Sequence, residues 1–287
     1  MLAAVRFPAL AVAILAMTGC AATGGDVPAS RRSTAASPSI ASVTPAPVPT
    51  ATPTATATPS ADKDSYQAGI CLDTAKTIRE VTCDRPHNFE VMLSKRLEQR
   101  RRPSVRSMSR TCWSALKTYL SSTDTAASRL EATHYGPWKG KDGKWRFSCL
   151  AAERGRNDKE VRRTGSLAGA LAGGLGAFQL CLEGEPLDEG PLRVVPCSRP
   201  HRSEAIPGVM AVDDFPPGRK GLMKVGLRAG LHCEKPGAAY LGGTRRGAES
   251  RGVAPTREAW LDGFTDAVCF VVSKTPVKGV MKSTGRP

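Results

Sequence analysis

The sequence has no hydrophobic run long enough to cross a bilayer comfortably. Its most apolar segment runs only from Phe7 to Met17, whereas a membrane-spanning helix needs about 20 apolar residues. A second apolar stretch, residues 166–180, is also short and is rich in glycine. Because Arg6 precedes the first segment and Thr-Gly-Cys follows it, that segment is typical of a secretory signal that is removed on export.

The sequence also lacks the common catalytic signatures. It contains no G-x-S-x-G, no H-E-x-x-H and no glycine-rich phosphate loop at a strand-to-helix junction. We therefore predict no enzyme activity, no cofactor and no metal. The alternative is a wall-active or redox enzyme that uses a Cys-His pair as nucleophile and base.

Acidic residues are few relative to basic ones, 26 Asp and Glu against 41 Lys and Arg, which gives a formal net charge of +15. Basic surfaces favour polyanions. For an exported protein these are anionic lipid headgroups and wall polymers, so we expect no nucleic-acid partner. We take Arg96, Arg100, Arg101 and Arg102 as the local candidates for polyanion contact. Solvated surface charge that maintains solubility is the alternative.

The end of the signal segment resembles a bacterial lipobox. Met17, Thr18 and Gly19 precede Cys20, so we expect residues 1–19 to be removed and the Cys20 thiol to be lipidated. A plain signal peptide is the alternative, but it would leave Cys20 as an odd free thiol outside the cell. The prediction places the protein on the extracytoplasmic face of the cell membrane, held there by a lipid.

Residues 20–65 are predicted to be a disordered tether after the lipidated cysteine. Ala, Thr, Pro and Ser dominate this segment, and it has almost no large apolar side chain that could be buried. A tether of this length spans roughly 40 Å as a flexible coil and about 140 Å as polyproline helix. It would lift a domain off the membrane and into the cell wall.

The rest of the chain reads as two copies of one pattern. The motif C-x-R-P-H-x-x-E occurs at residues 83–90 and again at residues 197–204. Without Cys20, the remaining eight cysteines fall into two sets of four, and the intervals around the third and fourth cysteine of each set agree. We predict domains at residues 66–155 and 178–275, joined by a connector at 156–177 and followed by a tail at 276–287.

Both copies predict the same elements. A strand is expected after each Pro-His pair, a helix around each third cysteine, and a strand around each fourth cysteine. The fold class is therefore α+β: two tandem small disulfide-bonded domains, each a short antiparallel sheet covered by one helix. We predict that residues 166–180 form a buried or inter-domain helix that packs one domain on the other.

The repeated motif itself has three interpretations. Cys, His and Glu are all metal ligands, but the spacing matches zinc sites poorly and export favours disulfides for the cysteines. A thiolate with a histidine base needs a free thiol, which paired cysteines do not offer. The third interpretation, which we favour, is a structural corner. Its cysteine fixes a strand, its proline sets the turn and its histidine ring bonds to backbone. The residues assigned to this corner are Pro86, His87 and Glu90 in the first copy, and Pro200, His201 and Glu204 in the second.

These residues resemble the septum-formation domain family of envelope lipoproteins and membrane proteins from high-GC Gram-positive bacteria. The family pattern is a G-x-C-L opening, C-x-x-P-H-x-x-E-V, a helix with a cysteine, and a closing Trp, Gly and Cys strand. The second copy departs from it at Gln179 and Ala205. The resemblance covers about 200 residues, implies an envelope location and an association with division, and supplies no catalytic role.

The disulfide map is predicted from the position of each cysteine in its copy. The first two cysteines of each copy flank a segment suited to a hairpin, the third lies on the covering helix and the fourth on a strand beneath it. The expected pairs are Cys71–Cys83, Cys112–Cys149, Cys181–Cys197 and Cys233–Cys269. The predicted function is a non-enzymatic binding or scaffold module linked to septum formation and cell division. Its partners are the membrane, through the lipid anchor, and an anionic wall polymer, an anionic lipid or another envelope protein.

Overall fold

The computed structural model describes residues 66–75, 77–98, 101–156, 159–187, 192–243 and 247–282. Every described residue belongs to one compact unit. Cys20, the predicted signal and the predicted tether lie outside the described residues. No helix in the described ranges is long and apolar enough to cross a membrane.

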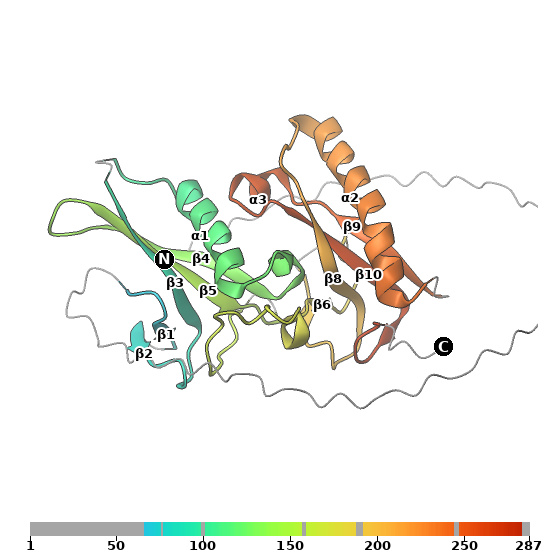
Figure 1. Cartoon of the computed structure of the whole chain (residues 1–287), viewed down its shortest axis with the longest axis horizontal. Coiled ribbons are helices and arrows are strands. Elements are labelled where there is room, and N and C mark those ends of the chain that lie inside the picture. The colour runs from blue at the N-terminus through green and yellow to red at the C-terminus, as the bar shows by residue number, and fades with distance from the viewer. Residues whose placement is uncertain are drawn as a thin grey trace, which may run out of the picture. The chain divides into compact units, whose positions relative to one another are not determined.

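The described chain forms two five-stranded antiparallel sheets with the same strand order (Figure 1). The first sheet has the order β2-β1-β3-β5-β4, with β1 at Cys71–Asp73, β2 at Arg79–Val81, β3 at Phe89–Leu97, β4 at Leu130–Lys139 and β5 at Trp145–Glu153. The second has the order β7-β6-β8-β10-β9, with β6 at Cys181–Leu182, β7 at Val194–Val195, β8 at His201–Ala211, β9 at Ala248–Val253 and β10 at Asp266–Val277. The predicted strands after the Pro-His pairs are β3 and β8, and those of the fourth cysteines are β5 and β10. The α+β class is confirmed.

Helix α1, Val105–Leu120, covers the first sheet (Figure 1). The side chain of Ser104 accepts a hydrogen bond from the backbone N–H of Ser107 at 3.2 Å and so caps the first turn. The buried residues of α1 recur every four positions, which gives one apolar face: Met108, Cys112, Leu116 and Leu120. Ser121 ends the helix in the left-handed region at φ 57°.

Helix α2, Gly218–Leu241, covers the second sheet in the same way. Its buried positions also recur every four residues, and several of them are small: Gly221, Val225, Ala229, Cys233, Gly237 and Leu241. The small residues allow a close approach to β9. A Cβ on Gly252 would lie 2.1 Å from the carbonyl oxygen of Ala229, so glycine is required there.

The four disulfides are Cys71–Cys83, Cys112–Cys149, Cys181–Cys197 and Cys233–Cys269. These are the predicted pairs. The first and third of these link a short strand, β1 or β6, to the turn that holds the Pro-His pair. The second and fourth link each covering helix to the strand beneath it. Each half is small, so its hydrophobic core alone gives limited stability. The disulfides add to this stability by restricting the unfolded chain.

The predicted helix at residues 166–180 is wrong. This segment forms turns and one short 3-10 helix, η3, at Gly176–Phe178. Gly169, Gly174 and Gly176 adopt φ of 67°, 100° and 48°, conformations that a continuous right-handed helix does not contain. The segment nevertheless contacts both halves, because Leu167 and Leu171 are buried in the core of the first sheet while Leu175 and Leu180 are buried in a core beside the second.

Several contacts join the two halves directly. Lys117 on α1 pairs with the buried carboxylate of Asp266 at 2.7 Å. The carboxylate of Asp124, in the 3-10 helix η1 at Asp124–Ala127, accepts hydrogen bonds from the backbone N–H groups of Gly208 and Val209 at 2.8 and 3.2 Å. A Cβ on Gly263, at φ 104°, would lie 2.6 Å from the Cα of Arg110 on α1. Gly263 follows the short helix α3, Arg257–Leu261. The halves therefore pack backbone against backbone at this point.

Candidate functional site

Each Pro-His motif holds its histidine ring against the backbone of its own turn. The Nδ1 atom of His87 lies 2.7 Å from the backbone carbonyl oxygen of Arg85, and Nδ1 of His201 lies 2.7 Å from that of Arg199. Both rings are fully buried. Because a carbonyl oxygen only accepts, Nδ1 carries the proton and donates in both corners.

The glutamate of the first corner anchors the segment that returns after β5. The Glu90 carboxylate accepts hydrogen bonds from the backbone N–H of Leu167 at 2.5 Å, from the hydroxyl of Ser166 at 2.5 Å and from the hydroxyl of Tyr119 on α1. Burial raises the pKa of Tyr119, and the adjacent Glu90 carboxylate raises it further. The motif thus fastens the helix and the return segment to one buried carboxylate.

The second corner repeats this arrangement with one addition. The Glu204 carboxylate accepts hydrogen bonds from the backbone N–H of Met281 at 2.8 and 2.9 Å and from the hydroxyl of Tyr240 on α2 at 3.0 Å. Met281 belongs to the predicted tail, so the described part of that tail is packed against the corner. The addition is His201, whose Nε2 lies 2.7 Å from Oε1 of Glu204.

His201 and Glu204 form a buried hydrogen-bonded pair. A neutral imidazole carries one N–H, yet the two ring nitrogens of His201 face the carbonyl oxygen of Arg199 and the carboxylate of Glu204. Burial lowers the pKa of His201, but the hydrogen bonds to Glu204 and to the Arg199 carbonyl outweigh this and raise the pKa above its ordinary value. When the ring carries both protons, it donates to both acceptors at once.

Two groups of ligand-type atoms lie close enough to hold a metal ion, with all atoms of each group within 4.8 Å of one another. They are Cys71, Cys83 and Glu90 in the first corner, and Cys181, His201 and Glu204 in the second. The cysteine sulfurs of both groups are in disulfides. A metal or a thiol-based reaction needs a thiolate, so these sulfurs serve neither purpose while the disulfides are intact.

The predicted polyanion contact is only partly described. Arg96, at the end of β3, pairs with Asp142 at 2.8 Å. Arg101 and Arg102 are exposed between β3 and α1, and the Arg102 guanidinium carbon lies 5.9 Å from the ring centroid of Trp145. Arg100 lies outside the described residues. Contact of this cluster with a polyanion stays a prediction.

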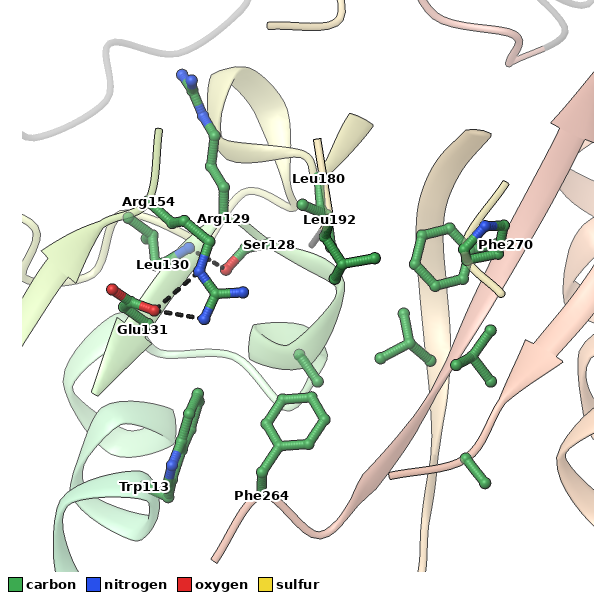
Figure 2. A pocket seen from close by; sticks show the side chains of 15 residues that line it. Trp113, Ser128, Arg129, Leu130, Glu131, Arg154, Leu180, Leu192, Phe264 and Phe270 are labelled. Atoms are coloured by element: carbon green, nitrogen blue, oxygen red, sulfur yellow. Dashed lines mark hydrogen bonds and ion pairs between the residues drawn. The ribbon is translucent and has the colours of Figure 1, made fainter. Parts of the chain in front are cut away.

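An apolar cavity of about 140 Å³ lies between the two halves (Figure 2). The first half contributes α1, η1 and the start of β4, and the second contributes β10 and the loops before β7 and β10. Its apolar lining includes Trp113, Ala126, Leu130, Leu180, Leu192, Val253, Ala254, Phe264, Val268 and Phe270. The rings of Trp113 and Phe264 meet edge to face, with centroids 5.0 Å apart. Both side chains are partly exposed.

The charged side chains at the cavity all form ion pairs. Glu131 accepts two hydrogen bonds from the Arg154 guanidinium at 2.9 and 2.5 Å, and this pair lies near Trp113 in Figure 2. Arg129 points away from the cavity in the same view and pairs with Glu153 at 3.0 Å. The cavity therefore presents an apolar interior beside one charge-paired rim.

Sequence reasoning did not find this cavity. Its lining comes from elements far apart in the chain, and no local motif marks Trp113, Glu131, Arg154 or Phe264 as neighbours. The one available signal was the match between the two halves. It predicted two similar units but gave no information on which faces would meet.

The fold and the site define a class of protein: a disulfide-bonded α+β protein whose two sheets share one strand order and enclose an apolar cavity between them. Residues 68–269 match the model of the Septum formation family. Because the match spans most of the chain, the protein belongs to this family. Family membership suggests a role related to septum formation.

No curated protein and no solved structure matches the chain.

Proposed function

We propose that the protein is an exported lipoprotein that acts as a non-enzymatic binding module of the cell envelope during septum formation. Membership of the Septum formation family supports the link to division. The lipobox-like sequence Met17 to Cys20 and the Pro- and Thr-rich residues that follow support the anchor and the tether.

We also propose that the chain carries two tandem copies of one domain. The two sheets have the same strand order, the four disulfides occupy equivalent places, and each corner glutamate bonds a tyrosine of the covering helix and a backbone N–H of the return segment. These equivalences extend through secondary structure, covalent links and buried polar contacts. A duplication accounts for all three together.

The observation that carries the binding role is the cavity between the halves. A cavity of about 150 Å³ lined by aliphatic and aromatic side chains is large enough for one benzene ring, and this one measures about 140 Å³. Its occupant is an apolar group of that size, such as a phenylalanine or leucine side chain of another envelope protein. The Glu131 and Arg154 pair at the rim offers hydrogen bonds to the backbone around such a side chain.

The non-enzymatic assignment is supported by the structural contacts that the cysteines and the corner carboxylates make. All eight cysteines from Cys71 onward are in disulfides, and both corner carboxylates accept several buried hydrogen bonds. An enzyme based on a Cys-His pair would need a reduced thiol at Cys83 or Cys197. Thiol titration of the purified protein separates the two proposals, because a free thiol at either position favours the enzyme.

The binding role is tested by filling the cavity. A photo-activatable cross-linker at Leu192, which lines the cavity, should capture one envelope protein in dividing cells. Ala254→Phe places a ring in the cavity and should abolish that adduct, while Ala239→Phe, an exposed alanine outside the cavity, should leave it unchanged. Capture that persists in Ala254→Phe, or is lost equally in both variants, would count against the cavity as the binding site.

The anchor is tested separately. Cys20→Ser should release the protein into the medium or leave an unprocessed precursor, whereas the wild-type protein should partition into detergent and incorporate a labelled fatty acid. Absence of the label from the wild-type protein would refute the lipoprotein assignment and leave the cavity proposal untouched.

A further inference from the structure

The outer face of α2 carries large apolar side chains in solvent. Leu222, Met223, Leu227 and Leu231 are 46, 65, 67 and 60% exposed. Single exposed apolar residues are ordinary on protein surfaces, but a contiguous group marks an interaction site. Met223, Leu227 and Leu231 recur every four residues and form such a group, which the fold leaves uncovered among the described residues. Leu222 lies about 100° around the helix from Met223 and is not part of it.

These apolar side chains lie beside a row of cations. Met223, Leu227 and Leu231 are spaced four residues apart and so form one line along the helix. Lys220, Lys224 and Arg228 have the same spacing and are all exposed, so they form a second line next to the first. We call these six residues the basic-apolar face. None of its three cations forms an ion pair with another described residue.

The fold does not require this arrangement. The buried face of α2 is a different set of positions, which includes Val225, Ala229 and Cys233. Helix α1 holds the equivalent place over the first sheet, and Val105 at its first turn is its one large apolar residue in the exposed class. The basic-apolar face is therefore a feature of the second half that the first half lacks. Because its residues are not part of the buried face of α2, the stability of the fold does not explain them.

We propose that the basic-apolar face docks on the surface of an anionic lipid bilayer, with α2 lying parallel to the membrane plane. A helix with an apolar row and adjacent Lys and Arg residues lies in this position, with its apolar side chains at the headgroup boundary and its cations near lipid phosphates. The inference uses α2 alone and does not depend on the lipid anchor proposed for Cys20.

Charge selects the bilayer over a second copy of the chain. Two basic-apolar faces placed against each other would bring Lys220, Lys224 and Arg228 close to the same cations of the partner, and like charges repel at such distances. The exposed acidic residues nearby are Asp213, Asp214 and Glu234. Asp213 and Asp214 precede α2, and Glu234 lies one turn beyond Leu231 at the end of the apolar line. The centre of the face, between Lys220 and Arg228, therefore stays positive.

The test places a reporter on this face in the full chain. Cys20→Ser removes the lipid, and Leu227→Trp keeps the position apolar and adds a fluorescent reporter. The protein is mixed with vesicles of phosphatidylglycerol and phosphatidylcholine that carry brominated acyl chains, and with vesicles of brominated phosphatidylcholine alone. Quenching of the reporter is obtained by subtracting the signal of the same chain without Leu227→Trp, which contains four native tryptophans. We expect quenching by the anionic vesicles and little by the neutral ones.

Two sets of variants separate local charge from total charge. Lys220→Gln, Lys224→Gln and Arg228→Gln together should lower the ratio of docked to undocked protein by about 100-fold, roughly fivefold for each cation. The matched control removes three exposed lysines elsewhere, Lys139, Lys274 and Lys278, and should have a much smaller effect. Met223→Ser with Leu231→Ser should abolish quenching. All these positions are exposed, so an unchanged thermal midpoint verifies the fold.

Raising the salt from 0.1 to 1 M should also reduce docking, because the Debye length falls from about 10 Å to about 3 Å. The proposal is overturned by absence of reporter quenching in anionic vesicles, by equal quenching in neutral vesicles, or by equal losses in the variant and its charge control. A stable dimer that shields the reporter without vesicles would show instead that the face binds a second copy.

Discussion

Protonation of His201 is predicted to stabilise the second half of the protein, and this stabilisation is predicted to disappear as the pH rises. The perturbations are a pH change and the substitution Glu204→Gln. They act on the same bond, between Nε2 of His201 and Oε1 of Glu204, which measures 2.7 Å between two fully buried side chains.

The sign follows from the direction of the pKa shift. The pKa of His201 is raised above its ordinary value, near 6.5. Between the pKa of His201 in the unfolded chain and its higher pKa in the folded protein, the folded protein holds a proton that the unfolded chain has released. The free energy of unfolding therefore falls as the pH increases in this range. The contribution is complete below the unfolded pKa and is lost as the pH rises through the folded pKa. A buried hydrogen bond between charged groups contributes about 1.5–3 kcal/mol, which sets the size of the effect.

Glu204→Gln should remove this pH dependence. The side-chain amide can donate to the neutral Nε2 of His201, and its oxygen can still accept from the Met281 backbone N–H, so the second proton on the ring is no longer favoured. The matched control is Glu90→Gln in the first corner. The Nε2 atom of His87 has no hydrogen-bond partner among the described residues, so this substitution should lower stability while the pH dependence stays as in the wild type.

The assay combines urea unfolding between pH 5.5 and 8.5 with NMR titration of individual histidine rings. Residue-specific data are needed because the chain has four histidines, and burial lowers the pKa of His134, which acts on stability in the opposite direction. The reasoning is refuted if His201 titrates at or below its ordinary value, or if Glu204→Gln has the same pH dependence as the wild type.

Three further substitutions and one control test the contacts that hold the fold. Gly263→Ala forces a methyl group against the backbone of α1 and should cost about 1–3 kcal/mol, whereas Gly173→Ala meets no atom within 4 Å and should be nearly neutral in thermal unfolding. Tyr119→Phe removes a donor to the buried Glu90 carboxylate and should cost about 1.5–3 kcal/mol in urea; an unchanged free energy of unfolding would show that this bond contributes nothing to stability. Cys83→Ser opens a loop of 12 residues and should cost about 3 kcal/mol in the chain-entropy model, measured by calorimetry against the wild type with its disulfides intact.

The fold was largely predictable because both copies of the repeated pattern carry the same secondary-structure signals. Strand and helix signals in one copy are supported by the same signals in the other, and the cysteine positions limit which elements can touch. The disulfide map followed from this reasoning. The helix at residues 166–180 failed because composition alone suggested it, and no second copy was available to test it. Three glycines there take positive φ, which hydrophobic content does not reveal.

The candidate site was less predictable because it depends on how the halves meet. The contact of Lys117 with Asp266 and the close approach at Gly263 join residues about 150 positions apart. A periodic pattern predicts which face of one element is apolar, but it does not say which of two similar units will cover that face. The exposed apolar residues of α2 could not be predicted for a related reason. Apolar spacing of three and four residues predicted a helix but did not show which of its apolar residues would be buried.

The repeated motif and the two proposed binding surfaces are therefore separate parts of the molecule. The motif residues make the backbone and tyrosine contacts that close each corner. They are Pro86, His87 and Glu90 and their counterparts in the second copy. The cavity and the outer face of α2 use other positions. In this chain a substitution at the cavity or at the outer face of α2 can therefore change the proposed binding without touching the corner contacts. The partner has to be sought through residues such as Trp113, Phe264 and Leu227.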